Sequence, residues 1–205
     1  MLAAPRLAFD GLVRRFDRLL VLRGVSGEVS AGGLLAVRGP NGSGKSTLLR
    51  CLAGLLGTER GTILAEEGGR ALDTPERRRR VGFLSPDLAL YDELSVAENL
   101  ELFARLRGLE DSRGQQLAER FALPAGRPWR ALSSGMRQRL RWAWALLHEP
   151  AILLLDEPFQ NLDAEGEATA RALLESHLEA GGLAVAASPV HLPLPALSGE
   201  LDLAG

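Results

Sequence analysis

The sequence predicts an α/β fold with a parallel-sheet core, and three observations support it. The apolar run Leu34 to Val37 leads into a glycine-rich loop, and Ser46 to Leu56 follows with leucines at helical spacing. Ala151 to Leu155 is an uninterrupted apolar run, which is typical of a parallel strand covered on both faces. Residues 88–148 are mostly helical in pattern. A strand, a glycine loop and a helix in that order open a βαβ unit, so we expect a helical subdomain inserted into a parallel-sheet core.

The remaining elements are predicted from shorter apolar runs. Residues 6–37 predict two or three short strands separated by glycine turns, which we interpret as an N-terminal antiparallel β subdomain. The whole chain, 1–205, is then one domain with the helical subdomain at about 88–148. Further strands are predicted at Val81–Leu84 and Leu183–Ala187, and the helices of the middle segment at Glu98–Leu106, Gln115–Phe121 and Gly135–Leu147.

Composition narrows the class of protein. Of 205 residues, 46% are hydrophobic and 24% charged, which suits a folded domain with a real core. The net charge of −2 gives no reason to expect nucleic acid or anionic lipid as a partner. No apolar run approaches the roughly 20 residues that a membrane span needs, and charges near the start oppose a secretory signal. With Cys51 as the lone cysteine, we expect a cytoplasmic protein.

The glycine-rich loop matches the pattern G-x-x-x-x-G-K-[ST]. Inward-facing amides of such a loop, together with the start of the next helix, bind the phosphates of ATP. Lys45 would add a positive charge, and the Ser46 hydroxyl would bind Mg²⁺. A chance glycine turn is the alternative, which the full match between a strand and a helix opposes. The predicted nucleotide-binding residues are Gly39, Pro40, Asn41, Gly42, Ser43, Gly44, Lys45, Ser46 and Thr47.

Two acids, Asp156 and Glu157, follow the strand 151–155. Ligands of open α/β sheets bind at the carboxyl ends of the strands, so these acids and the phosphate loop should face one crevice. Asp156 is then the predicted partner of Mg²⁺. Glu157 and Lys45 are the predicted catalytic residues, and Glu157 is the one that orients or deprotonates the attacking water. A solvated acidic turn is the alternative.

With both motifs present, the segment Leu132 to Arg139 becomes informative, because it resembles the signature LSGGQ of the ABC family of P-loop NTPases. Ser134 replaces a glycine and Met136 the glutamine. The resemblance implies that Ser133, Ser134 and Gly135 bind the ATP of a partner protomer, so that a homodimer forms on ATP binding. It covers nearly the whole chain.

The same resemblance assigns further positions and reveals two departures. Phe16 falls where the family places an aromatic residue that stacks on adenine, although such a residue is more often part of a core. Pro86 stands where the family has a glutamine that senses Mg²⁺ and contacts the membrane partner, and neighbouring Asp87 is a conceivable substitute. Pro189 replaces the family's switch histidine, and His191, two positions later, is a candidate for its role.

Function is expected from the family. ABC nucleotide-binding subunits hydrolyse ATP to drive transport through a separate integral membrane permease subunit, which would hold this chain at the inner face of the cell membrane. The strings Val81–Ser85, Leu90–Leu94 and Leu132–Met136 look like the ATP-binding subunit of the haem exporter of c-type cytochrome maturation. Three alternatives remain: an exporter of other cargo, a poorly hydrolysing regulatory subunit, and an ABC ATPase that acts on nucleic acid or ribosomes. Proteins of the last kind usually have two nucleotide domains.

Overall fold

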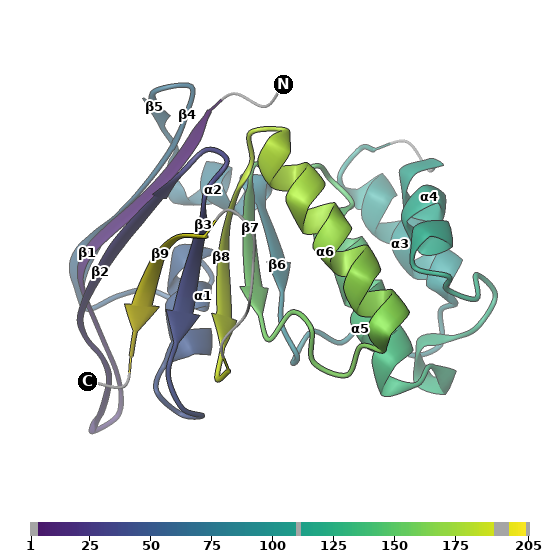
Figure 1. The fold of residues 1–205 in the computed structure, drawn as a ribbon, viewed down its shortest axis with the longest axis horizontal. Helices are drawn as coiled ribbons and strands as arrows, with labels where there is room; N and C mark the ends of the chain where they lie inside the picture. The colour runs from purple at the N-terminus through teal and green to yellow at the C-terminus, as the bar shows by residue number, and fades with distance from the viewer. Residues whose placement is uncertain (1–3, 110–111, 191–196, 204–205) are drawn as a thin grey trace.

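Two sheets and a group of helices make up the fold (Figure 1). The structure is a computed structural model that describes residues 4–109, 112–190 and 197–203. In chain order its elements are β1 (Pro5–Phe16), β2 (Leu19–Ser30), β3 (Leu34–Arg38), α1 (Lys45–Leu52), β4 (Arg60–Glu67), β5 (Arg70–Ala71), α2 (Thr74–Arg80), β6 (Val81–Leu84), α3 (Val96–Leu106), α4 (Ser112–Arg120), a 3₁₀ turn (Trp129–Ala131), α5 (Ser134–Leu146), β7 (Ile152–Asp156), α6 (Ala164–Glu179), β8 (Leu183–Ser188) and β9 (Leu197–Asp202).

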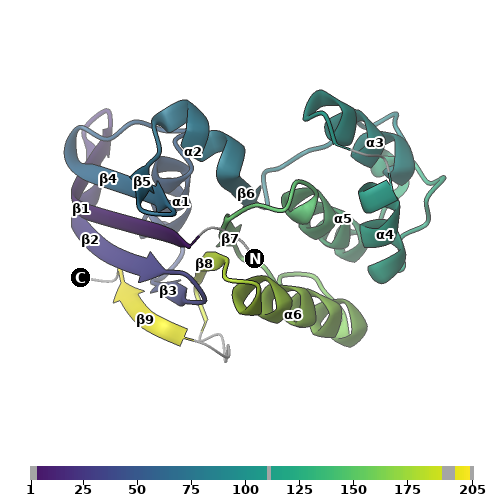
Figure 2. The same cartoon turned by 90° about the horizontal axis from the view of Figure 1, so that it is seen from above.

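The two sheets differ in strand direction. An antiparallel sheet has the order β2-β1-β4-β5, and a parallel sheet has the order β6-β7-β8-β3-β9. The antiparallel sheet lies on one side of the parallel sheet, while α3, α4 and α5 group at the opposite end of the molecule and α6 runs beside the sheet, against β8 and α5 (Figures 1 and 2). The predicted α/β class, with an N-terminal antiparallel part and helices inserted between β6 and β7, is confirmed.

The interior strand β7, between β6 and β8, is fully enclosed in the core. All five of its residues are buried. Leu153 and Leu155 pack on the side of α5 and α6, whereas Ile152 and Leu154 pack on the side of α1 and the antiparallel sheet. Burying each such side chain contributes about 1.5–3 kcal/mol. The carboxyl end of β7, where Asp156 stands, is therefore held firmly in place.

Several boundaries differ from the prediction. The first two short strands predicted in 6–37 are twelve residues long, because Gly24 and Gly27, which were read as turns, lie inside β2. Helix α1 ends at Leu52 instead of Leu56, where the chain turns at Gly54. Helix α3 begins two residues early because Ser95 and Glu98 form a capping box. The strands β4, β5 and β9 were not predicted.

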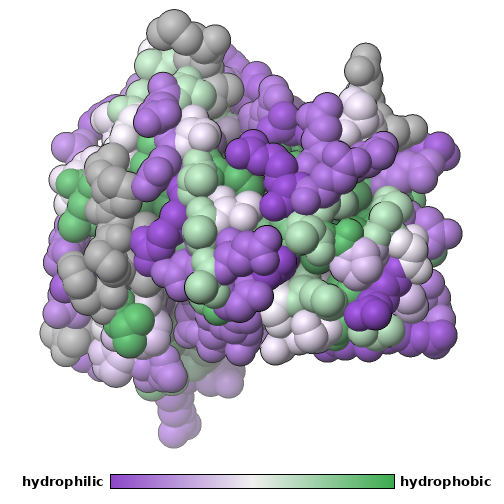
Figure 3. All heavy atoms as spheres, turned by 45° about the vertical axis from the view of Figure 1, so that its right-hand side comes forward, coloured by the Kyte–Doolittle hydropathy of each residue, from purple (hydrophilic) through white to green (hydrophobic). Residues whose placement is uncertain are grey.

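Within the described ranges, no helix is both long and apolar enough to cross a bilayer. The face drawn in Figure 3 is mainly hydrophilic, with small hydrophobic areas between the charged residues. The arginine run at the end of α2 is less solvated than its composition suggests, since Arg77 is buried.

Candidate functional site

The loop between β3 and α1 closes around the side chain of Lys45. This lysine is the first residue of α1 and is only 5% exposed. Its ammonium donates hydrogen bonds to the carbonyl oxygens of Gly39 at 2.7 Å and of Pro40 at 2.8 Å. A cation held inside a loop of backbone groups, at the start of a helix, provides a positive centre for phosphate oxygens.

Gly44 fixes the shape of this loop. Its backbone is left-handed, with φ 102° and ψ 6°, and a Cβ there would lie 3.0 Å from Cγ1 of Val21 on β2. Only glycine meets both conditions at low cost. Within the described part of the chain, the buried Ser43 hydroxyl has no hydrogen-bond partner. The loop therefore contains one unsatisfied buried hydroxyl as well as a buried cation.

The carboxylate of Asp156 lies beside the start of α1. It is 3% exposed, and its burial raises the pKa of Asp156 above the ordinary value, while a hydrogen bond from the Ser46 side chain opposes that rise. The charge of Glu157 also raises this pKa, and Arg50 and Lys45 lower it. The structure thus brings together Lys45, Ser46 and Asp156, three residues that the sequence predicted for one site.

Glu157 adopts a left-handed backbone that turns the chain away from β7. Its φ is 49°, its N–H donates to the carbonyl of Ala187 at 2.9 Å, and its own carbonyl accepts from Nε2 of Gln138 at 3.1 Å. The indole of Trp142 donates to the next carbonyl, that of Pro158, at 2.7 Å. Two residues of α5 therefore hold the backbone after β7, and the sequence analysis missed both. A glutamine on the apolar face of a predicted helix was the available signal for Gln138.

The N-terminus of α5 carries the signature segment. Ser133 caps the helix by accepting the Met136 N–H at 3.2 Å, and Ser133 and Ser134 are exposed. A Cβ on Gly135 would lie 2.8 Å from the carbonyl oxygen of Asn161. The signature and the loop before α6 therefore touch within one chain, and the free amides of α5 face solvent.

The signature and the phosphate loop are not brought together within one chain. Helix α1 packs on one face of the parallel sheet and α5 on the other, and the two helices are well separated in Figure 2. A phosphate held by the loop of one copy therefore needs a second copy to meet Ser133, Ser134 and Gly135.

The structure describes Phe16 but not His191, the two further site residues that the resemblance suggested. Phe16 ends β1 with 44% of its surface exposed, so it is not a core residue, and the Arg14 guanidinium lies 5.0 Å from its ring centroid. Its cross-strand neighbour Leu19 lines a hollow of about 550 Å³ beside residues 40–43 of the phosphate loop. His191 lies outside the described residues.

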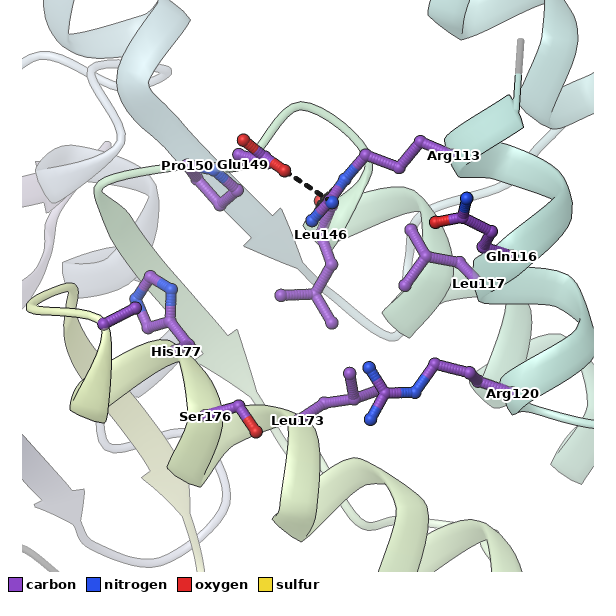
Figure 4. A pocket seen from close by; sticks show the side chains of 11 residues that line it. Arg113, Gln116, Leu117, Arg120, Leu146, Glu149, Pro150, Leu173, Ser176 and His177 are labelled. Carbon is purple, nitrogen blue, oxygen red and sulfur yellow. Dashed lines mark hydrogen bonds and ion pairs between the residues drawn. The ribbon is translucent and has the colours of Figure 1, made fainter. Parts of the chain in front are cut away.

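A separate hollow lies between α4 and α6 (Figure 4). Its volume is about 470 Å³, and the Arg113 guanidinium donates to the Glu149 carboxylate at 2.6 Å on its rim. The leucines Leu117, Leu146 and Leu173 also line it. None of its lining residues belongs to a predicted motif, so this hollow is not part of the nucleotide site.

Comparison with known proteins then identifies the family. The profile of the ABC transporter family matches residues 22–160, which include the phosphate loop, the signature and the acidic pair. The chain belongs to the ABC transporter family. It is an ATP-binding subunit of the ABC type and an ATPase.

Individual relatives agree with this placement. The cytochrome c biogenesis ATP-binding export protein CcmA of Mesorhizobium japonicum is 39% identical over 185 residues, covering 89% of this chain and 90% of the relative. The daunorubicin resistance ATP-binding protein DrrA3 of Streptomyces coeruleorubidus is 39% identical over 173 residues, covering 82% of this chain and 55% of the relative. Among solved structures, the ATP-binding cassette MJ0796, dimeric and bound to ADP and Pi, is 25% identical with a TM-score of 0.77, covering 89% of this chain and 87% of that chain.

Proposed function

We propose that this chain, as a single nucleotide-binding domain, binds Mg²⁺–ATP, closes on a second copy of itself, and drives transport through a separate integral membrane permease subunit. The observation that carries the proposal is the convergence of Lys45, Ser46 and Asp156 at one sheet edge, while the signature faces outward on the other side of the sheet. Each copy then supplies half of two composite sites.

The chemical roles follow from position. Lys45 and the amides of residues 39–47 hold the phosphates, and Ser46 with Asp156 holds the metal. Oxygen donors such as these suit Mg²⁺, which neutralises charge on the β- and γ-phosphates. Glu157, one residue beyond β7, orients or deprotonates the attacking water. Phe16, exposed near the loop, stacks on adenine, and His191 takes the switch role at the γ-phosphate.

The partner protomer completes the site. The exposed start of α5 offers free N–H groups and the positive end of a helix dipole, which stabilise the γ-phosphate of the opposite copy. Ser133, Ser134 and Gly135 are the residues involved. The dimer seen for MJ0796 supports this arrangement.

A groove at the β6 edge of the parallel sheet supports a permease partner. It encloses about 310 Å³ and is lined by apolar residues of the core and of α5, including Phe83 and Trp144, and by Arg78 and Arg107. It begins beside Pro86, the position that contacts the membrane partner in the family. Docking there would hold the chain at the cytoplasmic face of the membrane.

The proposed cargo is haem, exported for c-type cytochrome biogenesis. The CcmA relative matches along most of both chains, whereas the daunorubicin resistance relative matches along only about half of its own length. Deleting the gene in its host and measuring covalently bound haem in c-type cytochromes tests this assignment. Normal cytochrome levels would point to another cargo.

ATP hydrolysis by the proposed residues is tested with a pair of glutamates. Glu157 and Glu149 both have left-handed backbones, with φ 49° and 50°, but Glu149 lies far from the loop, beside Arg113. Glu157→Gln should abolish steady-state ATPase turnover, and Glu149→Gln should preserve it. Equal turnover in the two variants would rule out the role proposed for Glu157.

Purification from detergent-solubilised membranes should recover a companion with about six spanning helices; recovery with ribosomes or DNA would contradict the transport role.

A further inference from the structure

Ser85 is a buried polar residue that no motif explains. It follows β6 directly and is 4% exposed. Within the described residues, its hydroxyl has no hydrogen-bond partner. An unpartnered buried hydroxyl destabilises a fold, so its presence calls for a ligand that satisfies it.

The register of the sheet places Ser85 beside Asp156. Strands β6 and β7 are parallel, and Leu84 pairs with Leu155, so the next residues on the two strands, Ser85 and Asp156, are neighbours at the carboxyl edge. Adjacent strands lie about 4.8 Å apart. Side chains alternate along a strand, so Ser85 points to the same face as Phe83. Both residues line the α1 end of the groove described above, where Arg50 of α1 also lies. The Ser85 hydroxyl thus lies on the face of the sheet where Ser46 and Asp156 meet.

Pro86 and Asp87, which follow Ser85 in the chain, cannot provide a hydrogen-bonding group beside Asp156 in the same way. Pro86 has no side-chain donor or acceptor. The Asp87 side chain is 78% exposed and forms an ion pair with Arg50. Asp87, which the sequence offered as a substitute for the missing glutamine, is therefore engaged elsewhere.

We propose that Ser85 is a positioning residue of the metal site, whose hydroxyl holds a water molecule of the hydrated Mg²⁺ next to Asp156. The inference rests on the proposed binding of Mg²⁺–ATP. Mg²⁺ retains several of its waters when it binds proteins, and those waters need hydrogen-bond partners. Ser85 provides such a partner where the family's glutamine is absent.

Metal binding measured directly tests this role. Mn²⁺ replaces Mg²⁺ as a paramagnetic probe, and its affinity is followed by electron paramagnetic resonance in the presence of a non-hydrolysable ATP analogue. Ser85→Ala should weaken Mn²⁺ binding about tenfold, as outer-shell substitutions do, and Ser85→Thr should restore it. Affinity for the analogue without metal should not change.

Two comparisons separate this role from a structural one. Without ligands, Ser85→Ala should keep or raise the unfolding temperature, because no protein hydrogen bond is lost. Ser188, buried at the end of β8, already accepts the Val190 N–H at 3.1 Å, so Ser188→Ala should lower the unfolding temperature and leave Mn²⁺ affinity unchanged.

The outcomes are distinct. Two results would overturn the inference about Ser85: Ser85→Ala binds Mn²⁺ as tightly as the wild type, or it loses metal-free analogue binding to the same extent as Mn²⁺ binding. If Asp156→Asn still abolishes Mn²⁺ binding, the proposed metal site stands and only the role of Ser85 fails. If Asp156→Asn has no effect, the proposed metal site itself fails.

Discussion

Gly135, the second residue of α5, offers a sharp test of how the signature is positioned. A Cβ at this residue would lie 2.8 Å from the carbonyl oxygen of Asn161, whereas ordinary contact begins at 3.4 Å. Asn161 cannot move freely, since its backbone is left-handed with φ 62° and the Leu162 N–H donates to the Phe159 carbonyl beside it. Gly135→Ala should therefore push α5 and this loop apart by about 0.6 Å (3.4 minus 2.8 Å).

The energetic cost follows from this overlap. Inserting one methyl group into a packed contact costs about 1–3 kcal/mol, and the better helix propensity of alanine returns up to about 1 kcal/mol. For a cost of about 2–3 kcal/mol, the upper part of this range, the net loss is about 1–2 kcal/mol after the full return, which lowers the unfolding temperature of a domain of this size by about 2–8 °C. Because the displaced helix carries the residues proposed to bind the partner's ATP, ATP-dependent association should weaken as well.

Differential scanning calorimetry and light scattering measure the two effects of Gly135→Ala. Gly126→Ala is the matched control, because nothing lies within 4 Å of a Cβ at that position, and it should behave as the wild type. Unchanged stability and unchanged ATP-dependent association in Gly135→Ala would refute the proposed coupling between α5 and the Asn161 loop.

Three further predictions follow. Burial, with a smaller effect of Arg107, lowers the pKa of His148 from 6.5 to about 4. A histidine whose pKa is lower in the folded than in the unfolded protein contributes stability above its unfolded pKa, and that stability is lost as pH falls. The free energy of unfolding should therefore drop by about 2 kcal/mol between about pH 8 and about pH 5. His148→Gln should reduce the pH dependence by this amount in urea titrations, while the contribution of His177, whose pKa burial also lowers, remains in both proteins. Equal slopes in the variant and the wild type would contradict the role of His148. Gly82→Ala would place a Cβ 2.3 Å from the Ala145 carbonyl oxygen and should destabilise the fold by about 3 kcal/mol; an unchanged urea midpoint would contradict the packing of β6. Lys45→Ala should weaken metal-free ATP binding about 10- to 100-fold in calorimetric titration, whereas unaltered affinity would exclude its phosphate role.

The parts of the fold that the sequence predicted best are those governed by local pattern. The apolar run before Asp156 allowed only a buried strand, and the glycine loop had a strand before it and a helix after it. The acidic and basic residues of the site were therefore placed at the correct sheet edge. The same local logic failed for residues 60–80, where short strands alternate polar and apolar residues weakly.

Other features depend on contacts between distant segments and left no local signal. Gln138 looked like one polar residue on a helix, yet it binds the carbonyls of Glu157 and Pro158. Arg77 belongs to a run of four arginines, yet its guanidinium packs over Gly54 and is buried. The hydroxyl of Ser85 gained meaning only when the strand register placed it beside Asp156.

Association of two copies around ATP is the claim on which the account depends most. Light scattering of Glu157→Gln, with and without Mg²⁺–ATP, measures it directly. The chain of 22.0 kDa should double its mass to about 44 kDa only when nucleotide and metal are both present, and Ser133→Arg, which adds a bulky cation at the start of α5, should abolish the doubling. A mass that stays at 22.0 kDa under every condition would contradict the account.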